Sequence, residues 1–534
     1  MATRLIGTDT ANPRLPAVVI TATQGTTSAD LAPGDVGTGT LVLAKAYTDQ
    51  EIAEVVAGGV QFADNTETIV GTNDAKAVTP AGLAYERSYL DVRSYGATGD
   101  GSTDDTAAIN AALTAGAGHT VFVPKGTFMI DAVTGLKMTG AGTRLLLDAG
   151  ATLKVIPNAA TGYTVVEVLA ADCVIEGGTF LGDVGTHTGS TGEWGHLITT
   201  GIGGDRLRIV RTRVTKAWGD GIALEDNAAD VSIIDVVAED NRRNGISIIQ
   251  AVRPRVYGGV WRNQGLTANT APSSGICVEP NASGAVVDCV IVGATVTGNR
   301  GSGFQIASAT GSTNEVMVVG CRSNGSTTAH GFLITGPVDT IKCRLIGCQA
   351  NANTVTGFFA LTNRVEFTSC TAQANVQYGW QVQGSDCILT APVATENGRH
   401  GIQISAATVL NTTITGGLTR ANSQTTHASY VNIDQWGVGT RITGHVSEAG
   451  TLTNKPAWGY NIRASSTGRI VGCDARSGFA SGNYNDASGA GNTPAFPVPG
   501  IAKQTFNAAA TDPATTMALA NNLRTSLINL GFGA

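Results

Sequence analysis

Carboxylates are sparse in this chain, so the places where they gather stand out. Asp and Glu together number 41 among 534 residues, yet several fall within three successive units of an internal repeat. Hydrolysis of a glycosidic bond needs two carboxyl groups, about 5–5.5 Å apart for retention or about 6.5–9.5 Å apart for inversion. The candidate catalytic residues in these units are Asp220, Glu225, Glu239, Asp240 and Glu279.

One pair in this group has a spacing that favours joint action. Glu225 and Glu279 occupy the same outward position in strands two repeat units apart, which predicts backbones roughly 10 Å from each other. Side chains can close that gap to the inverting range, where one carboxyl protonates the leaving oxygen and the other activates water. Glu239 and Asp240 lie near the turn between them. The competing interpretation is a solvated face with ordinary turn residues.

Side chains suited to hold a sugar lie in the same stretch. An aromatic ring stacks on the apolar face of a sugar, and arginine binds the carboxylate of an acidic sugar. A Gly- and Thr-rich insertion, 182–204, is placed to wall a binding cleft. No metal-ligand spacing is present there, so neither a metal nor another cofactor is expected. The candidate substrate-binding residues are Trp194, His196, Trp218, Arg242, Arg243, Asn244 and Trp261.

The element that must position these residues is a repeat. A Gly followed by a large apolar residue recurs every 22–30 residues, from Gly221-Ile222 to Gly401-Ile402. A unit of that length, built of short β-type runs, fits one coil of a parallel β-helix. An Asn usually stands four residues before the Gly, and stacked coils would bond these side chains into a ladder. The Asn residues are Asn241, Asn299, Asn353, Asn375 and Asn397.

Alternation within each unit predicts which side chains point away from the core. After the Gly-apolar pair the strand places Ala223, Ser247 and Cys277 outward in three successive coils, so we expect them to face solvent. Cys321, Cys348 and Cys370 also fall at equivalent positions. We expect them to form a stack of small buried side chains with no metal or redox role.

The entry to the repeat, residues 91–130, contains a short capped helix. Thr103–Leu113 has helical spacing, with Ser102 or Thr103 as its N-cap, while Asp104 and Asp105 favour its positive end. Such a helix would cover the open end of a β-helix, which otherwise exposes strand edges and core. Asp104 and Asp105 are therefore expected to be structural and not catalytic.

The entry segment resembles the N-terminal cap of the pectate-lyase-like superfamily, in the branch shared by family 28-like glycosidases and bacteriophage tailspikes. Its Gly-Asp-Gly-x-x-Asp-Asp-Thr core at 99–106 and Pro-x-Gly-x-Phe at 124–128 carry the likeness. The resemblance implies an all-β, right-handed parallel β-helix. Residues 218–222 are similar to the family 28 motif whose Asp is catalytic, and only Asp220 carries over. Arg243, Asn244 and Ser274 stand where that family has Asp, Asp and His.

The flanks suggest a tail protein. Residues 61–90 are similar to a segment common in phage tail fibres and tailspikes, ahead of the receptor-binding part. We therefore predict virion attachment by 1–60, a linker at 61–90, the β-helix at 91–478 and a second linker at 479–512. A C-terminal helix at 513–534 has a leucine stripe that suits a three-stranded coiled coil and hence a homotrimer.

Composition narrows the partners and the location. The net charge is −7 and charged residues are 14% of the chain, against about 25% in typical proteins, which argues against nucleic acid or an anionic membrane. No signal core or spanning segment is present. We predict a tailspike that is made in the host cytoplasm, joins other tail proteins in the virion and acts at the bacterial cell surface. It would bind a bacterial surface polysaccharide and hydrolyse it; the alternatives are a non-enzymatic binder or, less favoured, a lyase.

Overall fold

A computed structural model describes residues 89–281, 284–308, 312, 314–337, 339–476 and 478–488. The predicted attachment segment at 1–60, the linker at 61–90 except its last two residues, and the C-terminal helix at 513–534 lie outside these ranges. The same holds for the second linker, 479–512, beyond residue 488.

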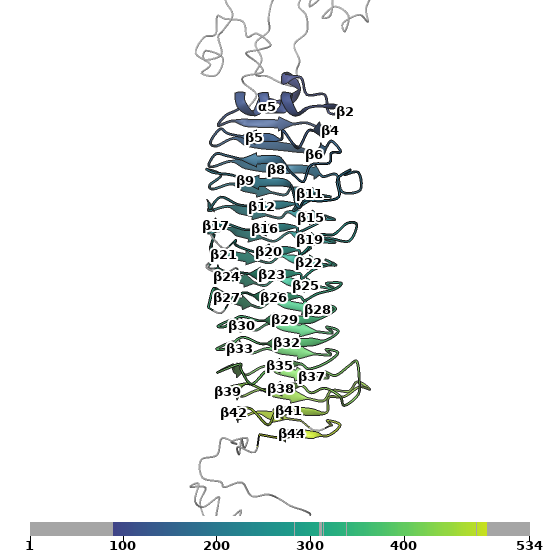
Figure 1. Cartoon of the computed structure of the whole chain (residues 1–534), viewed down its shortest axis with the longest axis vertical. Helices are drawn as coiled ribbons and strands as arrows, with labels where there is room; N and C mark the ends of the chain where they lie inside the picture. The colour runs from purple at the N-terminus through teal and green to yellow at the C-terminus, as the bar shows by residue number, and fades with distance from the viewer. Residues whose placement is uncertain are drawn as a thin grey trace, which may run out of the picture. The chain divides into compact units, whose positions relative to one another are not determined.

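The described chain winds into stacked coils of short parallel strands (Figure 1). In each coil three main strands follow one another, and each pairs in register with its equivalent in the next coil. This arrangement is the parallel β-helix that the repeat predicts, with the right hand that the resemblance of the entry segment implies. The three strands of one coil and their partners are β14 (Ser232–Ile234), β15 (Val237–Glu239) and β16 (Ile246–Ile248), with β18 (Arg255–Tyr257), β19 (Val260–Arg262) and β20 (Ile276–Val278).

The core is a column of side chains that stack from coil to coil. Phe304, Phe332, Phe358 and Trp380 are almost wholly buried, and successive ring centres lie 4.5, 4.9 and 4.8 Å apart. These residues follow the repeat Gly, so the Gly-apolar pattern marks the inward position of each strand. The ring spacing matches the strand spacing of about 4.8 Å.

The predicted asparagine ladder is present. Asn353 donates from its backbone N and its Nδ2 to Oδ1 of Asn375, at 3.0 and 2.9 Å, and Asn375 repeats the same pair of bonds to Asn397. The predicted cysteine stack is also confirmed, because Cys321, Cys348 and Cys370 are buried free thiols. The asparagine column supplies hydrogen-bond partners to backbone groups at the turns, where strand pairing stops. The cysteine column fills its turn with small, weakly polar side chains.

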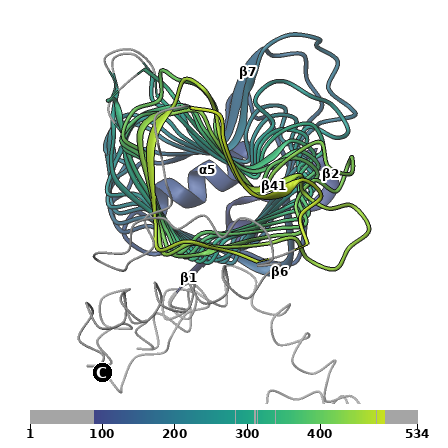
Figure 2. The same cartoon turned by 90° about the horizontal axis from the view of Figure 1, so that it is seen from below.

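The capping helix is α5, Thr106–Ala115, and Figure 2 shows it lying across one end of the coils. It begins three residues later than predicted, because β2 (Asp100–Asp104) pairs with β4 (Gly126–Ile130) and keeps the preceding residues extended. Asp105 accepts hydrogen bonds from the backbone N–H groups of Thr98 and Gly99. Asp104 accepts one from Thr106, so both carboxylates brace the cap, as expected.

One sheet of the described chain has 14 strands and carries the candidate site. Its outward column runs through successive coils from Lys137 to Glu167, Thr199, Ala223 and Ser247. The first strands of this sheet are β5 (Leu136–Met138), β7 (Gly162–Val168), β9 (Trp194–Thr200) and β12 (Ile222–Leu224), followed by β16 and β20.

The outward residues in the middle of this sheet are not exposed, contrary to the prediction. Ala223, Ser247 and Cys277 are all fully buried. A second layer of polar side chains lies over them, and the Oγ of Ser247 donates to Glu279 at 3.0 Å. A loop beyond β19 closes the layer, because the Nε of Arg243 donates to the carbonyl of Ala271 at 3.3 Å.

Candidate functional site

A buried charge cluster lies in this second layer, around one guanidinium. Nη1 of Arg243 is 2.8 Å from Oδ2 of Asp220 and 2.8 Å from Oε1 of Glu279. The two carboxylates therefore share one guanidinium nitrogen, close to each other and to Ser247. Asp220 is fully buried, and the Arg243 side chain is 14% exposed. The structure thus brings together three of the residues predicted for the site.

His196, Asp220 and Asn244 form a ladder that ties successive coils together. Nδ1 of His196 accepts the backbone N–H of Asp220 at 3.0 Å, and Oδ1 of Asp220 accepts that of Asn244 at 2.9 Å. Oδ1 of Asn244 then accepts the N–H of Ser274 at 2.8 Å. Each side chain satisfies a backbone donor that the strand ladder leaves unpaired. These residues have a structural task whatever else they do.

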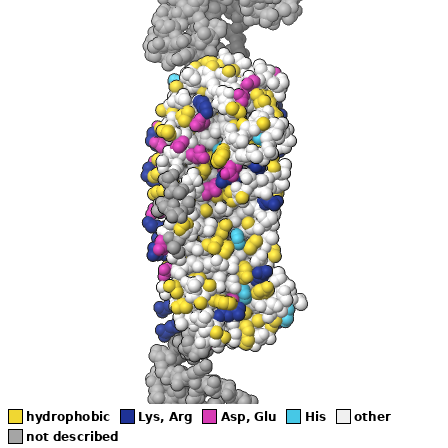
Figure 3. Space-filling model, viewed as in Figure 1, with side chains coloured by type: hydrophobic (Ala, Val, Ile, Leu, Met, Phe, Trp, Pro, Cys, Tyr) yellow, Lys and Arg dark blue, Asp and Glu magenta, His cyan; other side chains and the backbone are white. Residues whose placement is uncertain are grey.

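A groove of about 360 Å³ opens beside this cluster, against β5, β7, β9 and the residues after β12. Glu167, Glu225 and Asp226 line it, together with Lys137, whose Nζ is 2.5 Å from Glu167. Trp194 stands at its edge and is 60% exposed. Figure 3 shows acidic side chains gathered on this part of the face. The groove therefore combines carboxyl groups with an open aromatic ring.

Two carboxyl groups here are shifted toward the protonated form. Burial raises the pKa of Glu225, and the charges of Asp226, Asp220 and Glu167 raise it further. Burial also raises the pKa of Glu279, although Arg243 opposes the shift. A carboxyl with a raised pKa keeps its proton to higher pH than an ordinary one, which suits a general acid. Glu225 differs from Glu279 in lining the groove.

His196 contributes a buried imidazole to the groove lining. Burial lowers the pKa of its imidazole, although the charge of Asp220 acts in the other direction. Because Nδ1 accepts the Asp220 N–H, we assign the ring proton of the neutral form to Nε2. That Nε2 is buried and has no protein partner.

The predicted pair Glu225 and Glu279 keeps its register, with Ile249 between them. Leu224, Ile248 and Val278 pair in succession, so the residues that follow them share one column. Glu279, however, accepts hydrogen bonds inside the charge cluster, whereas Glu225 lines the groove. The two carboxyl groups therefore have different surroundings.

Two tryptophans predicted to stack on sugar are not available for it. The ring of Trp218 lies 3.8 Å from that of His187 and 4.0 Å from the guanidinium of Arg242. Two groups cannot share one face at that distance, so both faces are covered. Arg242 in turn donates to the carbonyl of Gly192 at 2.6 Å, which anchors the insertion. Trp261 is fully buried in the core, at an inward position of β19.

Glu239 and Asp240 lie away from the groove. Glu239 is on β15, outside the 14-stranded sheet, and is held by Arg213 and Arg262. Burial raises the pKa of Glu239, but hydrogen bonds and charge from the two arginines outweigh it and lower the pKa overall. Asp240 occupies a turn with φ of 55°. Both residues follow Glu225 within one repeat unit. The sequence pattern alone therefore did not distinguish turn residues from groove residues.

Lys137, Tyr163 and Glu167 belong to the groove but are absent from the sequence prediction. They lie on β5 and β7, in coils that precede the first Gly-apolar marker at Gly221. The outward alternation of those two strands would have revealed Lys137 and Glu167, once the register to Thr199 was known, but not Tyr163, which is buried.

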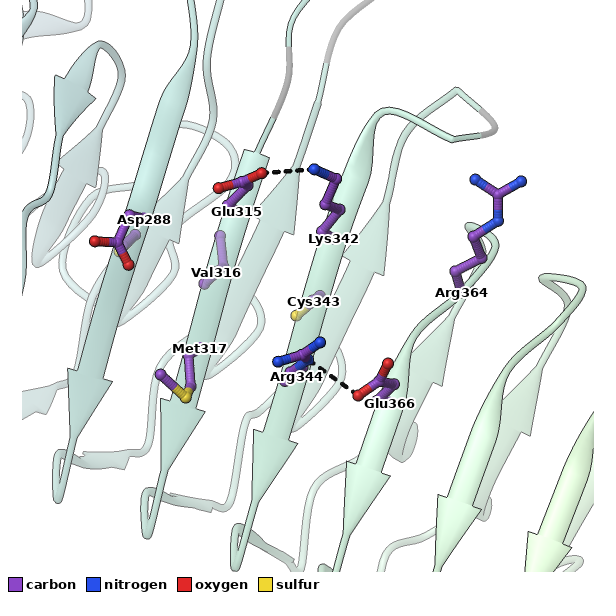
Figure 4. Close-up of a pocket in the computed structure, with 10 residues that line it drawn as sticks. Asp288, Glu315, Val316, Met317, Lys342, Cys343, Arg344, Arg364 and Glu366 are labelled. Carbon is purple, nitrogen blue, oxygen red and sulfur yellow. Dashed lines mark hydrogen bonds and ion pairs between the residues drawn. The ribbon is translucent and has the colours of Figure 1, made fainter.

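A second depression, of about 430 Å³, lies on the 30-stranded sheet (Figure 4). Its charges are already paired: Lys342 with Glu315 at 2.6 Å and Arg344 with Glu366 at 3.0 Å. This depression therefore lacks the unpaired groups found in the groove.

Two classes of feature are missing from the part of the chain that the structure describes. None of its helices is both long and apolar enough to cross a membrane. Within the same residues, no three His, Cys, Asp or Glu side chains are grouped so as to hold a metal ion.

Comparisons with known proteins agree with the fold. Residues 89–153 match the family described as "Rhamnogalacturonase A/epimerase, pectate lyase-like". YclG of Bacillus subtilis (strain 168) is 31% identical over 227 residues, which are 37% of this chain and 39% of that protein. The match thus spans about two fifths of that relative.

Solved structures extend the likeness to most of the chain. The pre-mature bacteriophage phi29 gene product 12 matches with a TM-score of 0.52 and 14% identity, over 74% of this chain and 57% of that one. The A-module of mannuronan C-5 epimerase AlgE4 from Azotobacter vinelandii has a TM-score of 0.45 and 17% identity, over 74% and 97%. The Dettilon tailspike protein has a TM-score of 0.45 and 15% identity, over 79% and 73%. The fold is that of a pectate-lyase-like β-helix, as the entry segment predicts.

Proposed function

We propose that this chain is a phage tailspike that binds a bacterial surface polysaccharide in the groove and cleaves it by hydrolysis. The observation that carries the proposal is Glu225, a carboxyl with a raised pKa in an open groove. Around it stand the exposed ring of Trp194 and the unpartnered Nε2 of His196. The tail-fibre-like segment at 61–90 and the fold shared with a phage protein support the viral setting.

In this mechanism Glu225 is the general acid. It protonates the oxygen of the leaving sugar, because its raised pKa keeps the proton available. Glu167, paired with Lys137, is the charged carboxylate of the groove that would activate water or attack the sugar. Glu279 and Asp220 hold Arg243 in place. Trp194 would stack on the sugar ring, and Nε2 of His196 would donate to one of its oxygens.

The test is an assay of new reducing ends. The full chain is incubated with capsule and wall glycans of candidate hosts, and absorbance at 232 nm is followed in parallel. Hydrolysis gives new ends without that absorbance, whereas a lyase gives both. Glu225→Gln and Glu167→Gln should each lower turnover by roughly 100-fold or more. Glu315→Gln, an exposed member of a surface ion pair, should leave it unchanged.

A non-enzymatic binder is the second candidate, and one observation favours it. Both oxygens of Asp220, the residue that carries over from the family 28 motif, are engaged by Arg243 and by the backbone of Asn244. A pure binder would retain glycan and release no ends, and Trp194→Ala would weaken its binding while Glu225→Gln would not. Retained binding without new ends would remove the hydrolytic part of the proposal.

The predicted homotrimer and attachment of the N-terminal segment to other tail proteins belong to the same proposal. Light scattering of the full chain would report the oligomeric state. Comparison with a chain lacking residues 513–534 would test whether the C-terminal leucine stripe is responsible.

A further inference from the structure

A second cluster of aromatic and basic side chains lies farther along the 14-stranded sheet. It spans β32 (Tyr378–Val382), β35 (Ile402–Ile404), β38 (Ile433–Gln435) and β41 (Trp458–Ile462), which are consecutive in the sheet. We call it the aromatic–arginine patch and define it by Tyr378, Arg399, Tyr430, Trp436 and Arg463.

Arg399 holds the first half of the patch. Its guanidinium lies 5.6 Å from the ring centre of Tyr378 and 5.7 Å from that of Tyr430, and Nη1 is 3.3 Å from the Tyr378 hydroxyl. All three side chains are half-buried. Each therefore keeps part of its surface available, while contact with the others limits its freedom.

Asp434 holds the second half of the patch, Trp436 and Arg463, in place. This fully buried carboxylate accepts from Nε of Arg463 at 2.8 Å and from Nε1 of Trp436 at 3.0 Å. The guanidinium of Arg463 lies 5.0 Å from the ring centre of Trp436. The Arg463 side chain is still 41% exposed. Since the ring and the guanidinium are held by one buried anchor, a ligand would not have to order them.

The charge of the patch is opposite to that of the groove. Two arginines face a single carboxylate, and among the described residues Arg399 pairs with no Asp or Glu. The groove holds Glu167, Glu225 and Asp226 against Lys137. Figure 3 shows basic and hydrophobic side chains on the lower part of the face whose upper part is acidic. A positive surplus on a chain of net charge −7 favours an anionic ligand.

We propose that the aromatic–arginine patch binds a carboxylated sugar unit of a polysaccharide chain. The carboxylate of such a unit would accept hydrogen bonds from Arg399 in the first half of the patch or from Arg463 in the second, and an apolar sugar face would contact the ring of Tyr430 or Trp436 beside it. The inference rests on the proposed function in one respect: the ligand is the same polysaccharide that enters the groove. Eight coils separate β12 from β38, so the two sites lie on the order of 40 Å apart.

That separation requires a polymer. A short oligosaccharide can occupy one site only, whereas a long chain engaged at both gains affinity through effective concentration. The patch would thus hold an acidic polysaccharide on the protein while the groove acts on another part of the same chain.

The experiment measures binding of the full chain to three uronate polymers, polygalacturonate, alginate and hyaluronan, each beside its carboxyl-reduced neutral form. Wild type should bind at least one acidic polymer tightly and its reduced form weakly. Arg399→Ala and Tyr430→Ala should each weaken the acidic complex roughly tenfold, and Arg399→Lys should recover part of the loss. Arg364→Ala, which removes an exposed arginine in the turn before Glu366 and outside the patch, is the matched control. Thermal unfolding confirms that each variant folds.

Two outcomes overturn the inference. One is wild-type binding to acidic polymers that is no stronger than to their reduced forms. The other is unchanged binding by Arg399→Ala and Tyr430→Ala. Either result leaves the reducing-end assay of the groove unaffected. Conversely, absence of new reducing ends together with a loss of binding in the Arg399 and Tyr430 variants would remove the hydrolase proposal and keep the patch.

Discussion

At the scale of single residues, Arg243 makes it possible for the carboxylates of Asp220 and Glu279 to be buried close together. Asp220 is fully buried and Glu279 is mostly buried, and two such like charges would repel each other without a cation between them. Charge from Asp220 and Glu279 raises the pKa of Arg243 despite its burial, so it stays charged at every working pH. The consequence for the groove is that Asp220 and Glu279 are occupied, which leaves proton exchange with a ligand to the carboxyl groups that line the groove, Glu225 among them.

Glu225 gives a prediction whose sign follows from its surroundings. Burial and neighbouring carboxylates raise its pKa in the folded state above the ordinary value of 4.5. At pH values below 4.5, Glu225 is protonated in both the folded and the unfolded protein, so it does not change the free energy of unfolding. At higher pH the unfolded protein releases the proton first, so the free energy of unfolding falls as pH rises. Glu225→Gln, which stays neutral, should therefore be more stable than wild type at pH 7 and nearly equal to it at pH 4.

Urea unfolding of both proteins at the two pH values measures this difference. Glu366→Gln, an exposed carboxylate paired with Arg344, is the control and should show no gain at pH 7. Equal unfolding free energies for Glu225→Gln and wild type across the range would mean that Glu225 is ordinarily solvated. A stabilised but inactive Glu225→Gln protein would indicate that activity depends on a destabilising carboxyl.

At the scale of elements, the coil is held by its turn as much as by its strands. The buried Asn375 accepts from the backbone of Asn353, donates to the carbonyl of Ala350 and bonds the next Asn in the ladder. Asn375→Ala leaves several of these groups buried without partners, at about 1–3 kcal/mol each. We expect a loss of about 3–5 kcal/mol in unfolding free energy by chemical denaturation.

The same coil supplies the control for that prediction. Gln373 is exposed on β31 (Thr371–Gln373), and Gln373→Ala should change the unfolding free energy by less than about 0.5 kcal/mol. Similar losses in the two variants would show that the ladder contributes no more than an ordinary surface side chain.

The elements also show why the sequence predicted the fold better than the site. The Asn and Gly-apolar positions recur from coil to coil, so the repeat alone is enough to identify the ladder and the inward column. Trp218 and Trp261 do not recur. The burial of Trp218 depends on His187, from an insertion about 30 residues earlier. Trp261 occupies an inward position that Ala238 and Val296 fill in the neighbouring coils, and the Gly-apolar pattern does not mark that strand. Contacts made once, between distant segments, leave no period in the sequence.

At the scale of the whole molecule, the coils form a line in which each contacts its neighbours. The 14-stranded sheet runs the length of the described β-helix, with the acidic groove toward its first strands and the aromatic–arginine patch toward its last. A rigid scaffold of this kind fixes the distance between two weak sites, which is what a polymer-binding surface requires. Stability should then depend on the continuity of the stack and not on any one interface.

Phe358 tests that continuity. It is fully buried in the middle of the stack on β29 (Thr356–Ala360), 4.9 Å from the ring of Phe332 and 4.8 Å from that of Trp380. Phe358→Ala should cost about 3–5 kcal/mol and raise amide hydrogen exchange in the coils on both sides. Tyr484, on the last described strand, β44 (Gly482–Asp486), stacks on Tyr460, and within the described residues it has no second stacking partner. Tyr484→Ala should cost less and raise exchange in β44 and β41 alone. Exchange that rises uniformly along the chain in both variants would show a single all-or-none unit in place of a line of coupled coils.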